Sequence, residues 1–225
     1  MIYITGDTHR DFSRLDDFNG KKEDMLIILG DAGINYQLDF IDLCIKEGLK
    51  KYKMKFFLVR GNHEERPENI PTYKEVDMFG GKVYIEEDYP HLIFAKDGEE
   101  YNIDGYSVLV IGGAYSVDKD YRIMHGYKWF KDEQLSNDEM QVIKDRVKGK
   151  HYDFVLTHTC PYKYEPVEVF LPGLDQKDID KSMEHFLDDV EESIDYDKWY
   201  CGHYHTEKET DKVEFMFQKV KKLQK

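Results

Sequence analysis

The sequence contains little cysteine, little proline and no long apolar run. Its three cysteines, Cys44, Cys160 and Cys201, have no regular spacing, which argues against a disulfide framework and fits a reducing cytoplasm. Proline accounts for 6 of 225 residues and no linker or repeat interrupts the chain, so we expect a single domain over residues 1–225. No apolar run approaches the ~20 residues that span a bilayer, and the N-terminus lacks the features of a signal peptide. We therefore expect a cytoplasmic protein with no membrane partner.

Positive charge is also scarce. Lys and Arg number 32 against 46 Asp and Glu, which gives a formal net charge of −14. Sequence-independent binding to DNA depends on Lys and Arg neutralising phosphates, so this balance argues against extended nucleic-acid binding. It does not exclude a local site that handles phosphate with metal ions. The hydrophobic content of 40% is too high for a disordered chain and sufficient for a packed core at this length.

The pattern of apolar residues predicts an α/β fold. Short apolar runs bounded by polar turns indicate buried strands at residues 2–5, 25–29, 55–59, 108–111, 154–156 and 199–201. Segments with helical spacing lie at residues 38–52, 132–147 and 178–194. Alternation of strands and helices is typical of α/β proteins. Residues 83–111 are richer in strand and turn signals, so we expect mixed sheets.

Almost every predicted strand ends in residues that can bind a metal. The segments are Gly6-Asp7-Thr8-His9, Gly30-Asp31, Gly61-Asn62-His63-Glu64, Thr157-His158 and Gly202-His203-Tyr204-His205. In open α/β sheets, ligands bind beyond the carboxyl ends of the strands, so these side chains are expected to meet. The glycines let the backbone turn sharply as it leaves each strand. Asp, Asn and His together suit Mn, Fe, Zn, Co or Ni.

In this order, the five motifs resemble the calcineurin-like metallophosphoesterase family, in particular its small bacterial and phage members. The resemblance extends from Asp7 to His205 and implies a four-layer α/β/β/α sandwich with two mixed sheets. It implies two divalent metal ions at the carboxyl ends of the strands, with Mn as the first expectation and Fe, Zn, Co or Ni as alternatives. The implied ligands are Asp7, His9, Asp31 and His205 for the first ion, and Asp31, Asn62, His158 and His203 for the second, with Asp31 bridging.

The activity implied by the resemblance is the hydrolysis of phosphomonoesters or phosphodiesters by a hydroxide activated between the two metals. The substrate would be a small molecule, a phosphoprotein or a nucleotide. Asp31, Asn62 and His63 are the implied catalytic residues, with His63 assisting the leaving group. Arg60 and Arg66 are candidate substrate-binding residues, because a guanidinium group can bind phosphate through two hydrogen bonds.

The second motif departs from the protein-phosphatase branch of the family. That branch continues as Gly-Asp-x-x-Asp-Arg-Gly, whereas this sequence reads GDAGINY and lacks both the second acidic residue and the arginine. The final Gly-His-x-His looks more like the phosphodiesterase, nuclease and small bacterial or phage branches. A protein-phosphatase activity is therefore disfavoured.

The segment from Tyr115 to Phe130 is aromatic and basic within an acidic protein. It is either a substrate-facing loop or a loop that packs over the edge of a sheet. In the first case Lys119 and Arg122 would bind phosphate, while aromatic rings would stack on a base or leaving group.

Two further functions remain open. A nuclease acting on nucleic-acid ends or single strands is disfavoured by the charge of −14 and weakly favoured by the segment 115–130. A non-catalytic interaction scaffold of the same fold is the alternative from another class. Such scaffolds typically lose the His after the Asn or several ligands, whereas this sequence keeps His63 and every ligand position.

Overall fold

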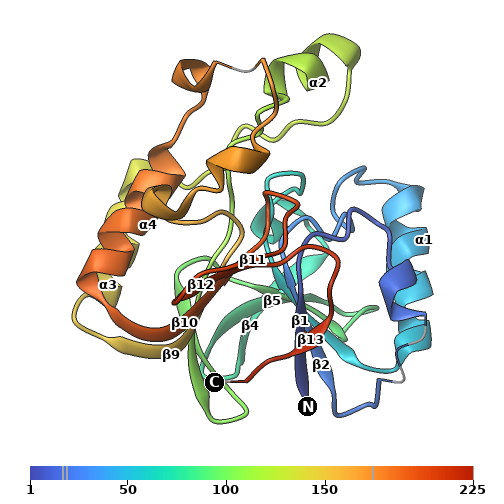
Figure 1. The fold of residues 1–225 in the computed structure, drawn as a ribbon. Coiled ribbons are helices and arrows are strands. Elements are labelled where there is room, and N and C mark those ends of the chain that lie inside the picture. The colour runs from blue at the N-terminus through green and yellow to red at the C-terminus, as the bar shows by residue number, and fades with distance from the viewer. Residues whose placement is uncertain (17, 19, 174, 225) are drawn as a thin grey trace.

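Two β-sheets lie face to face, with helices on their outer sides (Figure 1). The structure is a computed structural model that describes residues 1–16, 18, 20–173 and 175–224. In Figure 1, α1 covers one side of the molecule, whereas α3 and α4 cover the other. This arrangement confirms the predicted α/β sandwich with two mixed sheets.

The first sheet has seven strands in the order β13-β1-β2-β3-β6-β5-β4. Their bounds are Ile2–Thr5 (β1), Met25–Leu29 (β2), Lys55–Val59 (β3), Tyr73–Met78 (β4), Gly81–Glu86 (β5), Leu92–Ala95 (β6) and Lys221–Lys222 (β13). Strands β1, β2, β3 and β6 are parallel, and the other three pair antiparallel. The carboxyl ends of the central strands therefore lie at one edge of the sheet.

The second sheet has six strands in the order β11-β12-β10-β9-β8-β7. Their bounds are Glu99–Ile103 (β7), Tyr106–Ile111 (β8), His151–Thr157 (β9), Asp195–Cys201 (β10), Lys208–Glu209 (β11) and Val213–Phe215 (β12). Strands β8, β9, β10 and β12 are parallel. All six predicted strands are confirmed. Those around residues 108, 154 and 199 begin earlier than expected, because polar or half-buried residues interrupt the apolar pattern at their starts.

Four α-helices accompany the sheets: α1 (Phe40–Leu49), α2 (Lys119–His125), α3 (Asn137–Val147) and α4 (Ser182–Ser193). Short 3₁₀ turns occupy Ser13–Leu15, Lys50–Tyr52, Pro67–Asn69, Tyr162–Tyr164, Val167–Val169 and Gln176–Asp178. The three predicted helices are present but begin later than expected; a capping box between Ser136 and Glu139 sets the start of α3. Among the described residues, no helix is long and apolar enough to cross a membrane.

The segment 115–130 is not a plain loop, since it contains α2. The helix begins after Asp118 and ends at Gly126, whose φ of +70° is easily adopted by glycine. In Figure 1, α2 and the stretch that precedes α4 extend beyond the sheets at the same end of the molecule.

Three apolar clusters hold the layers together. The largest lies between the sheets and includes Ile27, Phe57, Val110 and Phe154. The other two lie under α3 and α4 on the second sheet and next to α1 on the first. Because both faces of the central strands are buried, their sequences are continuously apolar rather than alternating.

Replacing Phe57 by Ala is expected to lower the free energy of unfolding by about 3–5 kcal/mol. Phe57 is fully buried between the sheets and meets the rings of Tyr101 and Phe79 edge-on. Denaturant unfolding measures the loss. Phe40→Ala is the matched control, because Phe40 is 76% exposed and its removal should change stability by about 0.5 kcal/mol or less. Equal losses in the two variants would contradict this account of the core.

Candidate metal centre

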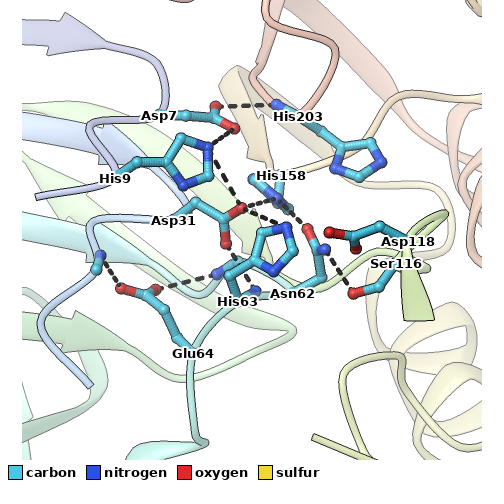
Figure 2. Close-up of polar contacts among 12 residues, drawn as sticks. Asp7, His9, Asp31, Asn62, His63, Glu64, Ser116, Asp118, His158 and His203 are labelled. Atoms are coloured by element: carbon cyan, nitrogen blue, oxygen red, sulfur yellow. Dashed lines mark hydrogen bonds and ion pairs between the residues drawn. The ribbon is translucent and has the colours of Figure 1, made fainter. Parts of the chain in front are cut away.

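The predicted metal ligands converge at the carboxyl ends of strands from both sheets (Figure 2). β1 and β2 deliver Asp7, His9 and Asp31, β3 delivers Asn62, and β9 and β10 deliver His158, His203 and His205. The two sheets supply ligands to the same place, so the site forms only when both are assembled against each other.

Asp31 lies at the middle of the cluster. Its Oδ1 accepts a hydrogen bond from the backbone N–H of His63 at 2.9 Å. Its Oδ2 lies 3.6 Å from Nε2 of His158, 3.8 Å from Nε2 of His63 and 3.9 Å from Nε2 of His9. One carboxylate oxygen is thus fixed by the backbone, while the other faces three imidazoles.

Asp7 is held in the same manner. Its Oδ1 accepts from the backbone N–H of His203 at 2.9 Å, and its Oδ2 lies 3.3 Å from Nε2 of His205. Oδ2 is buried, and no hydrogen bond reaches it from the part of the chain that the structure describes. A buried carboxylate oxygen without a donor is costly, so this atom is suited to coordinate a cation.

Asn62 is oriented by its neighbours. Its amide nitrogen donates to Ser116 Oγ at 2.8 Å, and Ser116 in turn donates to Glu133 at 2.5 Å. The amide oxygen therefore faces the cluster, 2.8 Å from Nε2 of His158. Nδ1 of His158 lies 2.7 Å from the carbonyl oxygen of Leu29 and donates its proton there, so Nε2 is the ring nitrogen that faces the cluster.

Four of the predicted ligands have left-handed backbone conformations. The φ angles are +44° for His9, +48° for Asp31, +67° for His203 and +49° for His205. Such conformations are uncommon for residues other than glycine and cost free energy. They aim the side chains back over the strand ends, so local backbone strain accompanies the convergence of the ligands.

The glycines before the ligands provide space as well as a turn. A Cβ atom at Gly30 would collide with the ring of His158, one at Gly61 with the carboxylate of Asp31, and one at Gly202 with the carboxylate of Asp7. From the sequence, these glycines were expected only to allow a sharp turn. Gly30 does have a positive φ of +93°, but at Gly61 and Gly202 the close approach of the neighbouring ligand is the reason.

The cluster carries strong negative potential. Burial alone would raise the pKa of Asp31, but the neighbouring His63 and His158 lower it well below its usual range. Burial opposes protonation of His158, yet Asp31 and then Asp7 raise its pKa to about 9. The two carboxylates therefore remain ionised and favour positive charge beside them, which is the electrostatic condition for binding a divalent cation.

The donor set fits metal ions. One ligand atom from each of Asp7, His9 and His205 lies within 4.8 Å of the others, and the same holds for Asp7, Asp31 and His158. Because Oδ2 of Asp7 also has no hydrogen-bond donor in the described chain, this geometry suits one or more divalent ions. Another group, His151, Asp153 and Asp197, lies on the opposite ends of β9 and β10, where His151 is exposed.

His63 lies beside the ligands but belongs to neither of the two groups that contain Asp7. Its Nε2 is 3.3 Å from a guanidinium nitrogen of Arg122, and its buried Nδ1 has no hydrogen-bond partner within the described chain. Burial lowers the pKa of His63; Asp31 opposes this effect and Arg122 reinforces it. The surroundings of His63 therefore disfavour the imidazolium form of its ring.

Of the predicted phosphate-binding residues, Arg122 reaches the cluster. Besides its contact with His63, its guanidinium binds Asp118 at 2.8 Å and the hydroxyl of Tyr36 at 3.0 Å. Lys119, on the same helix, instead lies over the ring of Trp129 at 4.4 Å. α2 thus brings Arg122 to the metal ligands and directs Lys119 to an aromatic ring.

Arg60 and Arg66 bind groups within the fold. Arg60 is 2% exposed; its guanidinium binds Asp97 at 2.9 Å and the carbonyl of Glu133 at 2.7 Å. Arg66 binds Glu139 at 2.6 Å and two backbone carbonyls. Most donors of both guanidinium groups are thus used within the protein, whereas Nη2 of Arg60 is buried without a hydrogen-bond partner in the described chain. The substrate-binding roles expected for Arg60 and Arg66 stay predictions.

Several residues of the site were not singled out by the sequence analysis. Glu64 accepts from the backbone N–H groups of Gly33 and Gly61, and so ties the turn after β2 to the turn after β3. Ser116 and Tyr36 orient Asn62 and Arg122. The only signal for any of these was the position of Glu64 directly after Asn62 and His63.

A cavity of about 430 Å³ opens beside the ligand cluster. Asp31, Asn62, His63, His203 and His205 form one end, and residues of the segments 115–118 and 169–184 form the other walls. Among them, Glu184 is 3% exposed and accepts a hydrogen bond from the Thr159 hydroxyl at 2.7 Å. Burial raises the pKa of Glu184 to about 7.

Comparison with protein families gives one match over most of the chain. Residues 1–207 match the family model described as calcineurin-like phosphoesterase. No curated protein matches the chain, so the family model alone carries the comparison.

Manganese is expected to stabilise the folded protein by about 2.7 kcal/mol when present at 100 times its dissociation constant. Asp31→Asn should abolish most of this stabilisation, because it removes the charge at the middle of the cluster. Thermal unfolding of chelator-treated protein, with and without added Mn, measures the effect. His151→Ala is the control, since it alters only the exposed group on β9 and β10 and should keep the shift. An unchanged Mn effect in Asp31→Asn would contradict the assignment of the centre.

The buried Glu184 is expected to make stability depend on pH. Burial raises its pKa to about 7 from an ordinary 4.5, so the folded protein holds this proton more tightly than the unfolded chain does. The resulting stabilisation is complete below about pH 4.5 and is lost as the pH rises through about 7. Glu184→Gln should remove this loss of stability, which is on the order of 3 kcal/mol between these pH values.

Denaturant unfolding of the metal-free protein at several pH values measures that change. Glu87→Gln is the matched control, because the side chain of Glu87 is 84% exposed. If Glu184→Gln lost as much stability as the unmodified protein over the same pH range, the buried carboxyl would not be the source of the pH dependence.

Proposed function

The chain belongs to the calcineurin-like phosphoesterase family, and from that premise we propose that it hydrolyses phosphomonoesters or phosphodiesters at a centre of two divalent metal ions. The observation that carries the proposal is the convergence of two buried carboxylates, four imidazoles and one amide oxygen beside His63 and Arg122. These residues are Asp7, His9, Asp31, Asn62, His158, His203 and His205. Mn is the metal we expect first.

We assign Asp7, His9, Asp31 and His205 to one ion and Asp31, Asn62, His158 and His203 to the other. Support for a bridging Asp31 comes from its Oδ2, which faces three imidazoles from three different strand ends. Bound there, the ions would supply Lewis acidity and lower the pKa of coordinated water. The protein holds its carboxylates in place with the backbone N–H groups of His63 and His203, so little reorganisation is needed.

His63 and Arg122 act on the phosphoester itself in this proposal. The guanidinium of Arg122 is positioned to bind a phosphoryl oxygen, because it already lies 3.3 Å from the ring of His63. Negative charge of the bound phosphoryl group raises the pKa of His63, since an opposite charge favours the imidazolium. The protonated ring then donates its proton to the departing oxygen, which avoids release of a free alkoxide.

A paired assay tests the proposal. Metal-stripped protein reloaded with Mn is offered p-nitrophenyl phosphate and bis-p-nitrophenyl phosphate, each with and without chelator. Chelator-sensitive cleavage of either ester is expected, and the faster one identifies a phosphatase or a phosphodiesterase. If protein that demonstrably binds Mn cleaves neither ester, the proposal is wrong and the non-catalytic scaffold is favoured.

His63→Ala is expected to lower kcat by about 10²–10⁴-fold on the better of the two esters, because it removes the proton donor. The bound metal, measured by elemental analysis, should not change. His151→Ala is the matched control, since His151 lies at the far end of β9. Turnover by His63→Ala at the rate of the unmodified protein would contradict the role given to this residue.

A further inference from the structure

The cavity beside the ligand cluster is apolar on the side away from the ligands. Its walls there come from the stretch after β8 and from the segment between β9 and α4, the two parts that extend beyond the sheets in Figure 1. The apolar side chains are Val117, Val169, Phe170, Leu171 and Ile179. At about 430 Å³, the cavity falls in the range of small-molecule sites and is continuous with the candidate metal centre.

No free cation lines this cavity among the residues that the structure describes. Apart from the histidines at the ligand end, Lys181 is the one basic residue among the described residues that line it, and its ammonium binds Glu165 at 2.6 Å while lying over the ring of Phe170 at 4.8 Å. Asp118 is paired with Arg122 at 2.8 Å. Lys181 and Asp118 are therefore already paired within the protein.

Glu184 makes the inner wall unfavourable for a second anion. One of its carboxyl oxygens accepts from Thr159, and the other is buried with no hydrogen-bond partner in the described chain. A further phosphate or carboxylate placed in the cavity would lose its hydration and find no unpaired positive charge. An apolar group would gain from burial at the same place.

We propose that the substrate is a phosphoester whose organic group is compact, uncharged and mainly apolar or aromatic. That group packs against Val169, Phe170 and Ile179, while its phosphate lies at the ligand cluster beside Arg122. This inference rests on the proposed function. Esters whose organic group carries further negative charge are disfavoured, because the described walls of this cavity offer that group no unpaired lysine or arginine.

Binding of non-hydrolysable phosphonates to the Mn-loaded protein tests the inference by calorimetry. Phenylphosphonate is expected to bind at least about tenfold more tightly than methylphosphonate, because burying the ring removes apolar surface from water. Phosphonoacetate, which adds a carboxylate instead, should bind no more tightly than methylphosphonate. Equal affinities for phenylphosphonate and methylphosphonate, or tighter binding of phosphonoacetate, would overturn the inference.

Val169→Asp places a charge on the apolar wall and should reduce the preference for phenylphosphonate to about threefold or less. Val169 is 40% exposed, so the fold should tolerate the change, and thermal unfolding checks this. Val142→Asp is the matched control; Val142 is 57% exposed on α3, and the variant should keep the full preference. An undiminished preference in Val169→Asp would place the organic group elsewhere.

The outcomes separate this inference from the function on which it rests. Hydrolysis of esters without a preference for the aromatic phosphonate overturns the inference alone. Selective binding of phenylphosphonate by a protein that cleaves no ester overturns the proposed hydrolysis and leaves the apolar binding site in place.

Discussion

The structure depends on burying two carboxylates, Asp7 and Asp31, at the junction of the two sheets. Each is almost fully removed from water, and one oxygen of each is fixed by a backbone N–H group. The remaining oxygens face imidazoles rather than lysine or arginine side chains. An arrangement of this kind is stable when positive charge is supplied locally, either by protons on histidine or by metal ions.

That requirement explains features that stability alone would not favour. Four predicted ligands have left-handed backbones, and glycines before Asp31, Asn62 and His203 leave room that a Cβ would fill. Buried polar groups then hold the loops in place: Glu64 joins two turns, and Arg60, directly after β3, binds the carbonyl of Glu133 between α2 and α3. Four of the nine residues other than glycine that have positive φ in the described chain are thus predicted ligands.

The strands and the positions of the candidate ligands at strand ends could be predicted because each depends on residues that are close together in the sequence. Continuous apolar runs mark strands buried on both faces, and the residue types at strand ends mark the chemistry. The sequence indicated four basic residues as candidates for phosphate binding but could not show which of them lies beside the ligands. Arg60 adjoins a motif in the sequence but points into the protein, whereas Arg122 is 59 residues from His63 and reaches it only through the position of α2. Ser116 and Tyr36 act through tertiary contacts that no local pattern specifies.

The central claim is that this cluster holds two divalent ions with Asp31 between them. A crystal structure of the Mn-loaded protein, with anomalous differences recorded at the manganese edge, tests it most directly. The account predicts two manganese peaks on either side of the Asp31 carboxylate, one beside His9 and His205 and the other beside His158 and His203. A single peak, or manganese bound only at the exposed His151 on the opposite end of β9, would contradict it.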